Sequence, residues 1–418
     1  MRISTPRLYW LTAAGLVALG VLAGAAAFGD VRGRSALITD VAGVSGPVSV
    51  DAQTLYRALA DADATAATAF LATEGESATL RDRYLTDVAR ATAALTVALR
   101  DADGENAARL GVVADQLPVY TGLVETARAN QRLGVPLGGA YLREASGLMQ
   151  QTILPAAAGV LDRTSEHLAG EQEEAAGFPW AATLMTVLLV VALVAAQVLL
   201  ARRSRRILNL GLVAASAVVA LALLWSVIAL GVSGRRLDTG RRDGTALVEL
   251  LANAGRASLQ ARANESLTLV ARGGGAEFEK TFAARMDELI GRDGTGGLFA
   301  RALARAPSDD RPLIGEARDA AVRWRVLHDE VRAADDGGDW NRAVELATAD
   351  GPEALPAVFA RLDDSLLRAL DAGNERVERQ AGRAGGALTG LAAGLVVLTG
   401  GLVAAVGAGF RPRIGEYR

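Results

Sequence analysis

The sequence predicts an all-α protein with four transmembrane helices and two tandem four-helix bundles outside the membrane, related by an internal duplication. Four runs of apolar or small residues carry no charged side chain, whereas the long regions between them are highly charged. Those regions are rich in Ala, Leu, Arg and Glu, with little β-branched alternation, which favours helices. Features of the first half recur in the second half at a nearly constant offset.

The first run, residues 8–28, follows a short N-terminal segment, residues 1–7. It is long enough to cross a hydrocarbon core, which takes about 20 helical residues. Ala25 and Ala27 also fit an A-x-A-like cleavage site, so a signal peptide is the alternative. The third run is the counterpart of the first and has no cleavage option, which favours a retained anchor.

The other three runs are residues 178–200, 207–232 and 387–410. A soluble core helix of this length would show a polar stripe, which these runs lack. None of the four runs contains Asp, Glu, Lys, Arg or His. Coupled transporters normally need an ionisable group inside the membrane, so the sequence disfavours transport.

Arginine placement predicts the orientation of a multi-pass protein in the plasma membrane. Seven arginines lie in the loop at 201–206 and the tail at 411–418: Arg202, Arg203, Arg205, Arg206, Arg411, Arg413 and Arg418. Positive flanks stay in the cytoplasm, so both termini and this loop are expected inside, and residues 29–177 and 233–386 outside. The arginines at 202–206 and 411–413 are also candidates for binding anionic membrane lipid and for docking a cytosolic partner.

The duplication is visible at both ends of the outer regions. Val31 and Gly33 correspond to Val232 and Gly234, and Leu154-Pro155-Ala156 corresponds to Leu355-Pro356-Ala357. Each copy contains a span, an outer region and a second span, so the copies run parallel, unlike the inverted repeats of many transporters. Pro155 and Pro356 lie within the fourth helical pattern of each copy and predict matching kinks or breaks.

Turn-forming residues divide each outer region into four helices, which suits an antiparallel bundle with both ends at the membrane. The predicted breaks are at residues 43–47, 74–76, 104 and 133–136, and at 273–275, 291–297, 307–311 and 337–338. We expect the first and fourth helices of each region to continue from the flanking spans.

Two glycine ridges are expected to let spanning helices pack closely, within one chain or between two copies in a homo-oligomer. The first span contains Gly20 and Gly24, and the fourth begins with Gly386, Gly390 and Gly394.

No catalytic residue, cofactor site or metal site is expected, and the chain is not interpreted as an enzyme. It has no cysteine and two histidines, which excludes thiol catalysis, iron–sulfur clusters and Cys-ligated zinc. His328 is expected to be a hydrogen-bonded helix residue. Acidic pairs such as Asp335-Asp336 lack EF-hand spacing, and we interpret them as solvated faces and caps. The inner segments are too short for a catalytic or nucleic-acid-binding domain.

The segment Thr65-Ala66-Ala67-Thr68-Ala69-Phe70-Leu71, followed by Glu74-Gly75-Glu76, resembles the first helix and turn of chemoreceptor and sensor-kinase ligand-binding modules. No HAMP linker, kinase or methyl-accepting coiled coil follows. The duplicated units, the Arg-Arg-Ser-Arg-Arg hairpin and the short tails more closely resemble the GlnX-type membrane proteins of actinobacteria. That resemblance implies an external amino-acid-binding lipoprotein (GlnH) and a soluble Ser/Thr kinase (PknG) as partners.

The leading hypothesis is therefore a non-enzymatic transmembrane relay that couples amino-acid availability outside to a cytoplasmic Ser/Thr kinase. Direct small-molecule sensing by one of the outer regions is the main alternative. A structural or assembly role in the cell envelope is a further alternative.

Overall fold

A computed structural model of the chain describes residues 5–40, 46–71, 78–102, 104–177, 179–204, 209–239 and 244–415. Within these ranges the chain is helical and has no β-strand, so the predicted all-α class is confirmed. The chain divides into two compact units. We call residues 1–44, 169–240 and 378–418 the apolar unit, and residues 45–168 and 241–377 the charged unit.

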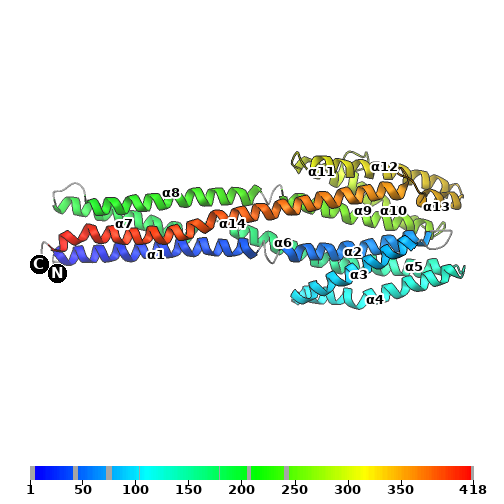
Figure 1. The fold of residues 1–418 in the computed structure, drawn as a ribbon, viewed down its shortest axis with the longest axis horizontal. Helices are drawn as coiled ribbons and strands as arrows, with labels where there is room; N and C mark the ends of the chain where they lie inside the picture. Colours follow the sequence, from blue (N-terminus) through cyan, green and yellow to red (C-terminus); the bar gives the residue numbers. More distant parts are fainter. Residues whose placement is uncertain are drawn as a thin grey trace. The chain divides into compact units, whose positions relative to one another are not determined.

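The apolar unit is made of α1 (Thr5–Asp40), α7 (Trp180–Ser204), α8 (Leu210–Thr239) and the C-terminal part of α14 (Leu355–Gly415) (Figure 1). Among the described residues, three stretches are long and apolar enough to cross a membrane: Trp10–Leu37, Trp180–Arg202 and Gly390–Arg411. They agree with three of the predicted spans and indicate a membrane protein. The described apolar part of α8, Leu210–Ser226, is shorter, so a fourth span and the orientation stay predictions.

Glycine lets helices of the apolar unit approach one another closely. A Cβ atom at Gly20 would lie 2.6 Å from Leu402 Cδ2, and one at Gly24 would lie 2.3 Å from Thr399 Oγ1. These contacts join α1 to α14, and Gly394 of α14 similarly lies against the indole ring of Trp225 in α8. The glycines of both predicted ridges thus include close packing positions.

The other two ridge glycines differ. Gly390 has open space where a Cβ would be. Gly386 lies in α14, at a position whose side-chain surroundings are not described.

In the charged unit, residues 45–168 form three helices and one longer helical segment. The three helices are α2 (Gly46–Leu71), α3 (Ala78–Asp101) and α4 (Gly104–Arg132). The longer segment contains α5 (Leu137–Leu148), the π-helical turn η2 (Met149–Ile153) and the first part of α6 (Leu154–Ala176).

Residues 241–377 of the charged unit form more helices than the four predicted. They are α9 (Ala246–Val270), α10 (Ala276–Ile290), α11 (Gly297–Arg305), α12 (Arg311–Asp336), α13 (Trp340–Thr348) and the first part of α14. Seven of the eight predicted breaks fall at or beside ends of described helices, and the break at 74–76 lies outside the described residues. The break between α13 and α14 was not predicted. The short helices α11 and α13 make this region different from a simple four-helix bundle.

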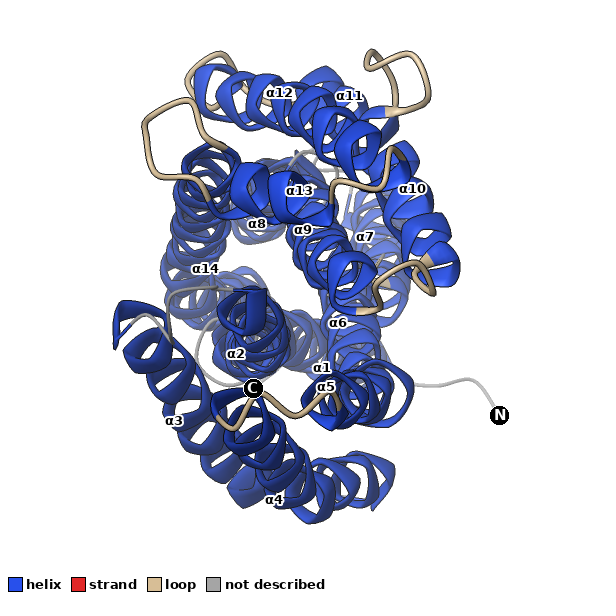
Figure 2. Cartoon of the chain, turned by 90° about the vertical axis from the view of Figure 1, so that its right-hand side faces the viewer, coloured by secondary structure: helices blue, strands red, loops and turns tan. Residues whose placement is uncertain are grey.

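The two regions of the charged unit pack into one body, although the sequence predicted a separate bundle for each copy. Helices α2 and α9 lie side by side, with α3 and α4 on one side of the unit and α11 and α12 on the opposite side (Figure 2). Gln260 Nε2 donates a hydrogen bond to Tyr56 Oη at 2.8 Å, and the Thr68 and Ser266 hydroxyl oxygens are 3.2 Å apart.

Pro155 and Pro356 are each the second residue of a helix, α6 and α14. At Pro356, in the first turn of α14, the proline sacrifices no hydrogen bond, whereas Pro155 lies inside the continuous helical segment 137–176 and removes one backbone donor there. Pro155 directly follows the π-helical turn η2, whereas Pro356 follows an irregular segment, residues 349–354.

The predicted continuity between outer helices and spans is found, within the described residues, in α14 alone. The junctions between α1 and α2 and between α8 and α9 include residues outside the described ranges, so continuity there stays a prediction, whereas the described residues 177 and 179 are not helical and separate α6 from α7. Helix α14 instead runs for 61 residues from the charged unit into the stretch Gly390–Arg411.

Candidate functional site

A cavity of about 820 Å³ lies in the charged unit where four helix ends meet. It is bordered by the C-terminal ends of α9 and α12 and by the N-terminal ends of α10 and α13. Its lining is mainly polar and contains Thr268, Arg272, Gly273, Gly275, Ala276, Glu279, Arg332, Asp335, Asp336, Gly338, Asp339, Trp340 and Asn341. We call this space the α9–α13 cavity.

The turn between α9 and α10 has a backbone that few residues can adopt. Gly273 has φ +85°, which glycine tolerates without steric cost. A Cβ atom at Gly275 would lie 2.6 Å from the carbonyl oxygen of Thr268, so the turn closes only with glycine there. Arg272 has φ +42° without being glycine, and such a conformation costs of order 1–3 kcal/mol. Backbone strain therefore lies at the edge of the cavity.

Arg272 and Trp340 form the aromatic part of the cavity lining. The guanidinium carbon of Arg272 lies 4.0 Å from the centroid of the Trp340 ring, in a cation–π arrangement. The indole N–H of Trp340 donates a hydrogen bond to the carbonyl oxygen of Leu269 at 2.9 Å. This hydrogen bond fixes the ring, so its face is held in place at the first residue of α13.

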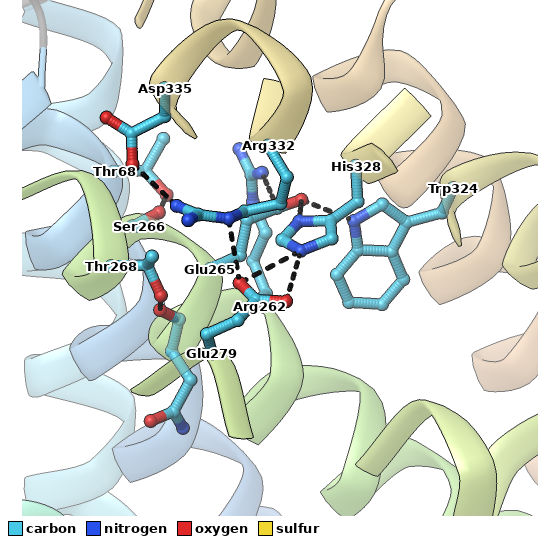
Figure 3. Close-up of polar contacts among 11 residues, drawn as sticks. Thr68, Arg262, Glu265, Ser266, Thr268, Glu279, Trp324, His328, Arg332 and Asp335 are labelled. Carbon is cyan, nitrogen blue, oxygen red and sulfur yellow. Dashed lines mark hydrogen bonds and ion pairs between the residues drawn. The ribbon is translucent and has the colours of Figure 1, made fainter. Parts of the chain in front are cut away.

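Arg332 gathers three carboxylates on one wall of the cavity. Its guanidinium forms ion pairs with Asp335 and Asp336, and its Nε atom lies 3.5 Å from Glu279 Oε2 (Figure 3). The side chain of Asp335 is only 11% exposed, so the expectation of a solvated acidic pair does not describe this residue. The wall is a charged network that connects α12 to α10.

Behind this wall, His328 bridges two glutamates. Its Nδ1 atom lies 3.0 Å from Glu265 Oε1, and its Nε2 atom lies 3.1 Å from Glu279 Oε1 (Figure 3). The ring of Phe282 stacks on the imidazole at 3.6 Å. Burial alone would lower the pKa of His328, but the hydrogen bonds and charges of the two glutamates outweigh it and raise that pKa to about 9. The imidazolium is therefore the stable form at neutral pH.

Glu265 anchors the buried end of the network. Its carboxylate accepts a hydrogen bond from the indole N–H of Trp324 at 3.0 Å and pairs with Arg262 in the same helix. Burial favours the neutral acid, yet Arg262, His328 and Trp324 together hold the pKa of Glu265 below its ordinary value. The next residue, Ser266, contacts Thr68 of α2. The network that begins at the cavity therefore ends at Glu265, whose neighbour in α9 lies at the α2–α9 interface.

A second group of buried polar residues lies on the other side of this interface. Asp63 of α2 accepts hydrogen bonds from Ser146 Oγ at 2.6 Å and from Gln150 Nε2 at 3.2 Å. Burial outweighs these bonds and raises the pKa of Asp63. Gln150 belongs to the π-helical turn η2, and its Oε1 atom also accepts from Asn264 Nδ2 of α9 at 3.4 Å. Such π-helical turns occur frequently at functional sites.

Residues that the sequence singled out lie elsewhere. Arg202 and Arg411 are exposed in the apolar unit, near the ends of α7 and α14. Arg203 and Arg413 lie in the same two helices, with side chains that are not described. Arg205 and Arg206 fall outside the described residues.

The sequence interpretation anticipated the hydrogen-bonded state of His328 but missed the rest of the cavity and its network. One local signal was present: Arg262, Asn264, Glu265 and Ser266 are consecutive or nearly consecutive polar residues in a helix that is buried on most sides. Polar groups are retained in such a position only when they have partners. Among the described residues, no cluster of His, Asp and Glu suited to a metal ion is found.

The comparisons with known proteins bear on the first half of the charged unit. Residues 37–173 match the family model described as an actinobacterial sensor domain. Searches of curated proteins and of solved structures find no match. The match supports an actinobacterial sensor membrane protein with a sensing or signalling role.

Proposed function

We propose that the chain is a non-enzymatic transmembrane relay, in which the charged unit receives a signal outside the cell and helix α14 carries it inward. The observation that supports this most directly is the continuity of α14. Its first turns contribute Leu362 and Leu366 to the buried core of the charged unit, and the same helix contains the apolar stretch Gly390–Arg411. A rigid helix transmits small rotations or shifts when a packed element has two arrangements.

The proposed partners follow from the resemblance to GlnX-type proteins. An external amino-acid-binding lipoprotein would contact the charged unit, and a cytoplasmic Ser/Thr kinase would contact the inner ends of the spans. Exposed Arg202 and Arg411 are consistent with the inner contact. The match to a sensor domain supports the sensing part of this proposal.

A helix-breaking insertion tests the relay. Gly-Gly is inserted after Gly382, which is exposed in α14, and kinase-substrate phosphorylation is followed in cells as external amino acids are varied. The relay predicts loss of the response, because two glycines weaken the helix by about 2 kcal/mol and change its register. The same insertion after Asp350, in the irregular segment before α14, is the control. An unchanged response with the Gly382 insertion would overturn the proposal.

Direct small-molecule sensing is the second candidate, and the α9–α13 cavity is the observation that favours it. Ligand pockets typically measure about 300–1,000 Å³, a range that contains this cavity. Its wall connects through Glu279, His328 and Glu265 to the α2–α9 interface. A ligand in the α9–α13 cavity would act on the packing of α2 against α9, as a protein partner bound to the charged unit would. Stabilisation of the full chain by a small molecule, without any binding protein, would distinguish this route.

A further inference from the structure

We propose that the α9–α13 cavity binds a small organic cation, an amine or a guanidinium compound, between the Trp340 ring and the carboxylates at the end of α12. Binding depends on the cavity alone. Only the effect of binding in the cell rests on the proposed sensing role.

The charge of the lining favours a cation. Four carboxylates, of Glu279, Asp335, Asp336 and Asp339, face two guanidinium groups, of Arg272 and Arg332. Protonated His328 lies behind Glu279 and offsets one carboxylate. One negative charge remains in excess, and an opposite charge placed among these groups relieves it. The Asp336 side chain is 68% exposed, so it can reach a ligand without losing buried packing.

The aromatic wall supplies the matching surface. Cations bind preferentially over the face of an indole ring, and Trp gives the strongest such contact among the aromatic residues. In this structure Arg272 lies over the Trp340 ring. A guanidinium is therefore already accommodated on this face, and a ligand cation competes with it.

The size of the cavity selects an organic ion. A volume of about 820 Å³ is far larger than a bare metal ion needs, and the described residues contain no metal-ligand cluster. Asp339 is partly engaged, because it accepts a hydrogen bond from the backbone N–H of Arg342 and caps α13. Asp335 and Asp336 both pair with Arg332, and Asp336, the more exposed of the two, is the carboxylate best placed to meet the cationic head, with Trp340 beside its apolar part.

Titration calorimetry on the full chain in detergent micelles tests the proposal, with agmatine and tyramine as cation probes, succinate as the anion probe and β-alanine as the zwitterion probe. We expect both cations to bind and succinate not to bind. Trp340→Leu should weaken cation binding by about tenfold, and Trp340→Phe, which keeps an aromatic face, should weaken it less. Asp336→Asn should weaken it by about threefold to fivefold, whereas Asp329→Asn, an exposed position on the same helix, should not.

The decisive variant is Arg272→Asn. Asparagine tolerates a positive φ, so this change keeps the turn while it removes a positive charge and uncovers the indole ring. The organic-cation proposal predicts binding that is tighter by about fivefold. A site for a carboxylate or a zwitterion predicts weaker binding instead, since its anion partner would be lost.

Thermal unfolding followed by circular dichroism shows that each variant is folded. Failure of both cations to bind the wild-type chain and the folded Arg272→Asn variant would overturn the proposal, as would preferential binding of succinate or β-alanine. Cation binding without any change in kinase-substrate phosphorylation would uphold this inference and contradict direct sensing through the cavity, whereas the proposed relay is tested separately by the Gly382 insertion, so the two failures are distinguishable.

Discussion

Buried ionisable side chains distinguish the charged unit from an ordinary helical core. Glu265 and His328 are almost fully buried, and each is compensated by partners at hydrogen-bond distance. Burying a charge without such partners costs several kcal/mol, so the network is stable only when it is complete. The consequence is that single substitutions in it should have large effects.

His328→Gln removes the cation that bridges Glu265 and Glu279. We expect a loss of roughly 3 kcal/mol in the free energy of unfolding near pH 7, because these two glutamates lose the cation between them and keep only Arg262, Trp324 and Arg332 as described partners. Chemical denaturation of the full chain in detergent micelles measures this loss. His167→Gln is the matched control at an exposed position and should change stability by less than about 0.5 kcal/mol. Equal effects of the two changes would contradict the network as described.

The same residue predicts a pH dependence. The pKa of His328 is raised to about 9 in the folded chain, so its contribution to stability is complete below the ordinary value of about 6.5 and is lost as pH rises through 9. The unfolding free energy of the wild-type chain should fall across this window. His328→Gln should flatten the fall, and a slope that persists in this variant would contradict the assignment.

Asp61 predicts a second pH effect at lower pH. Burial raises its pKa to about 7, against the lowering effect of Arg57 and with additional raising by Asp363 and Asp87. Its contribution to stability is therefore present below about pH 4 and is lost as pH rises through 7. Asp61→Asn should stabilise the chain by roughly 1–2 kcal/mol above pH 7 and have no effect near pH 3. Thermal melts at several pH values check this, and destabilisation at pH 8 would contradict it.

At the scale of helices and turns, the positions of helix breaks depend on local backbone preferences, whereas the continuity of a helix into a span depends on packing. Glycine and proline act on the backbone locally, which is why the seven predicted breaks that the described residues test lie at or beside helix ends. Whether a helix continues into a neighbouring span depends on packing at both ends, and of the expected continuations the described residues contain only that of α14. The break between α13 and α14 does carry a local signal, the turn-forming pair Gly351-Pro352, which the predicted partition did not include.

Close packing of α8 on α14 predicts an effect of a single methyl group. A Cβ atom at Gly211 would lie 2.3 Å from Gly409 Cα and 2.7 Å from the Ala405 carbonyl oxygen, so the two backbones would have to separate. Gly211→Ala should lower the unfolding free energy by about 1–3 kcal/mol in detergent micelles. Gly407→Ala, where a Cβ meets open space, is the control and should be neutral or stabilising. A neutral Gly211→Ala would show that these helices are not in contact.

At the scale of the whole molecule, the two regions of the charged unit depend on each other. Arg57 of α2 forms an ion pair with Asp363 of α14, and α2 buries one face against α9. The sensor-domain match, residues 37–173, covers only the first of these regions. A segment defined by that match would leave the α9-facing side of α2 uncovered.

Expression of residues 45–168 alone should therefore give a self-associated or partly unfolded protein. Adding residues 241–377 in trans should restore a cooperative thermal transition, because it covers the apolar and polar groups of α2. Size-exclusion chromatography with light scattering and thermal melts measure the two states. A monomeric, cooperatively folding 45–168 segment would contradict the single charged unit.

Local pattern alone determined the helical class, three apolar spans and nearly all helix ends, because these depend on residues close in the chain. It also excluded cysteine chemistry by composition. The sequence predicted a separate bundle for each copy, because the local pattern does not show that α2 packs against α9.

Only the tertiary structure decided where the charged residues meet. Glu265, Glu279 and His328 are separated by up to 63 positions, and the packing of α9, α10 and α12 brings them within hydrogen-bond distance. The pair Asp335-Asp336 looks like an ordinary helix end in the sequence, yet Arg332 and Trp340 make it one wall of a cavity. Such a site arises from the angles and contacts between helices, which local periodicity does not specify.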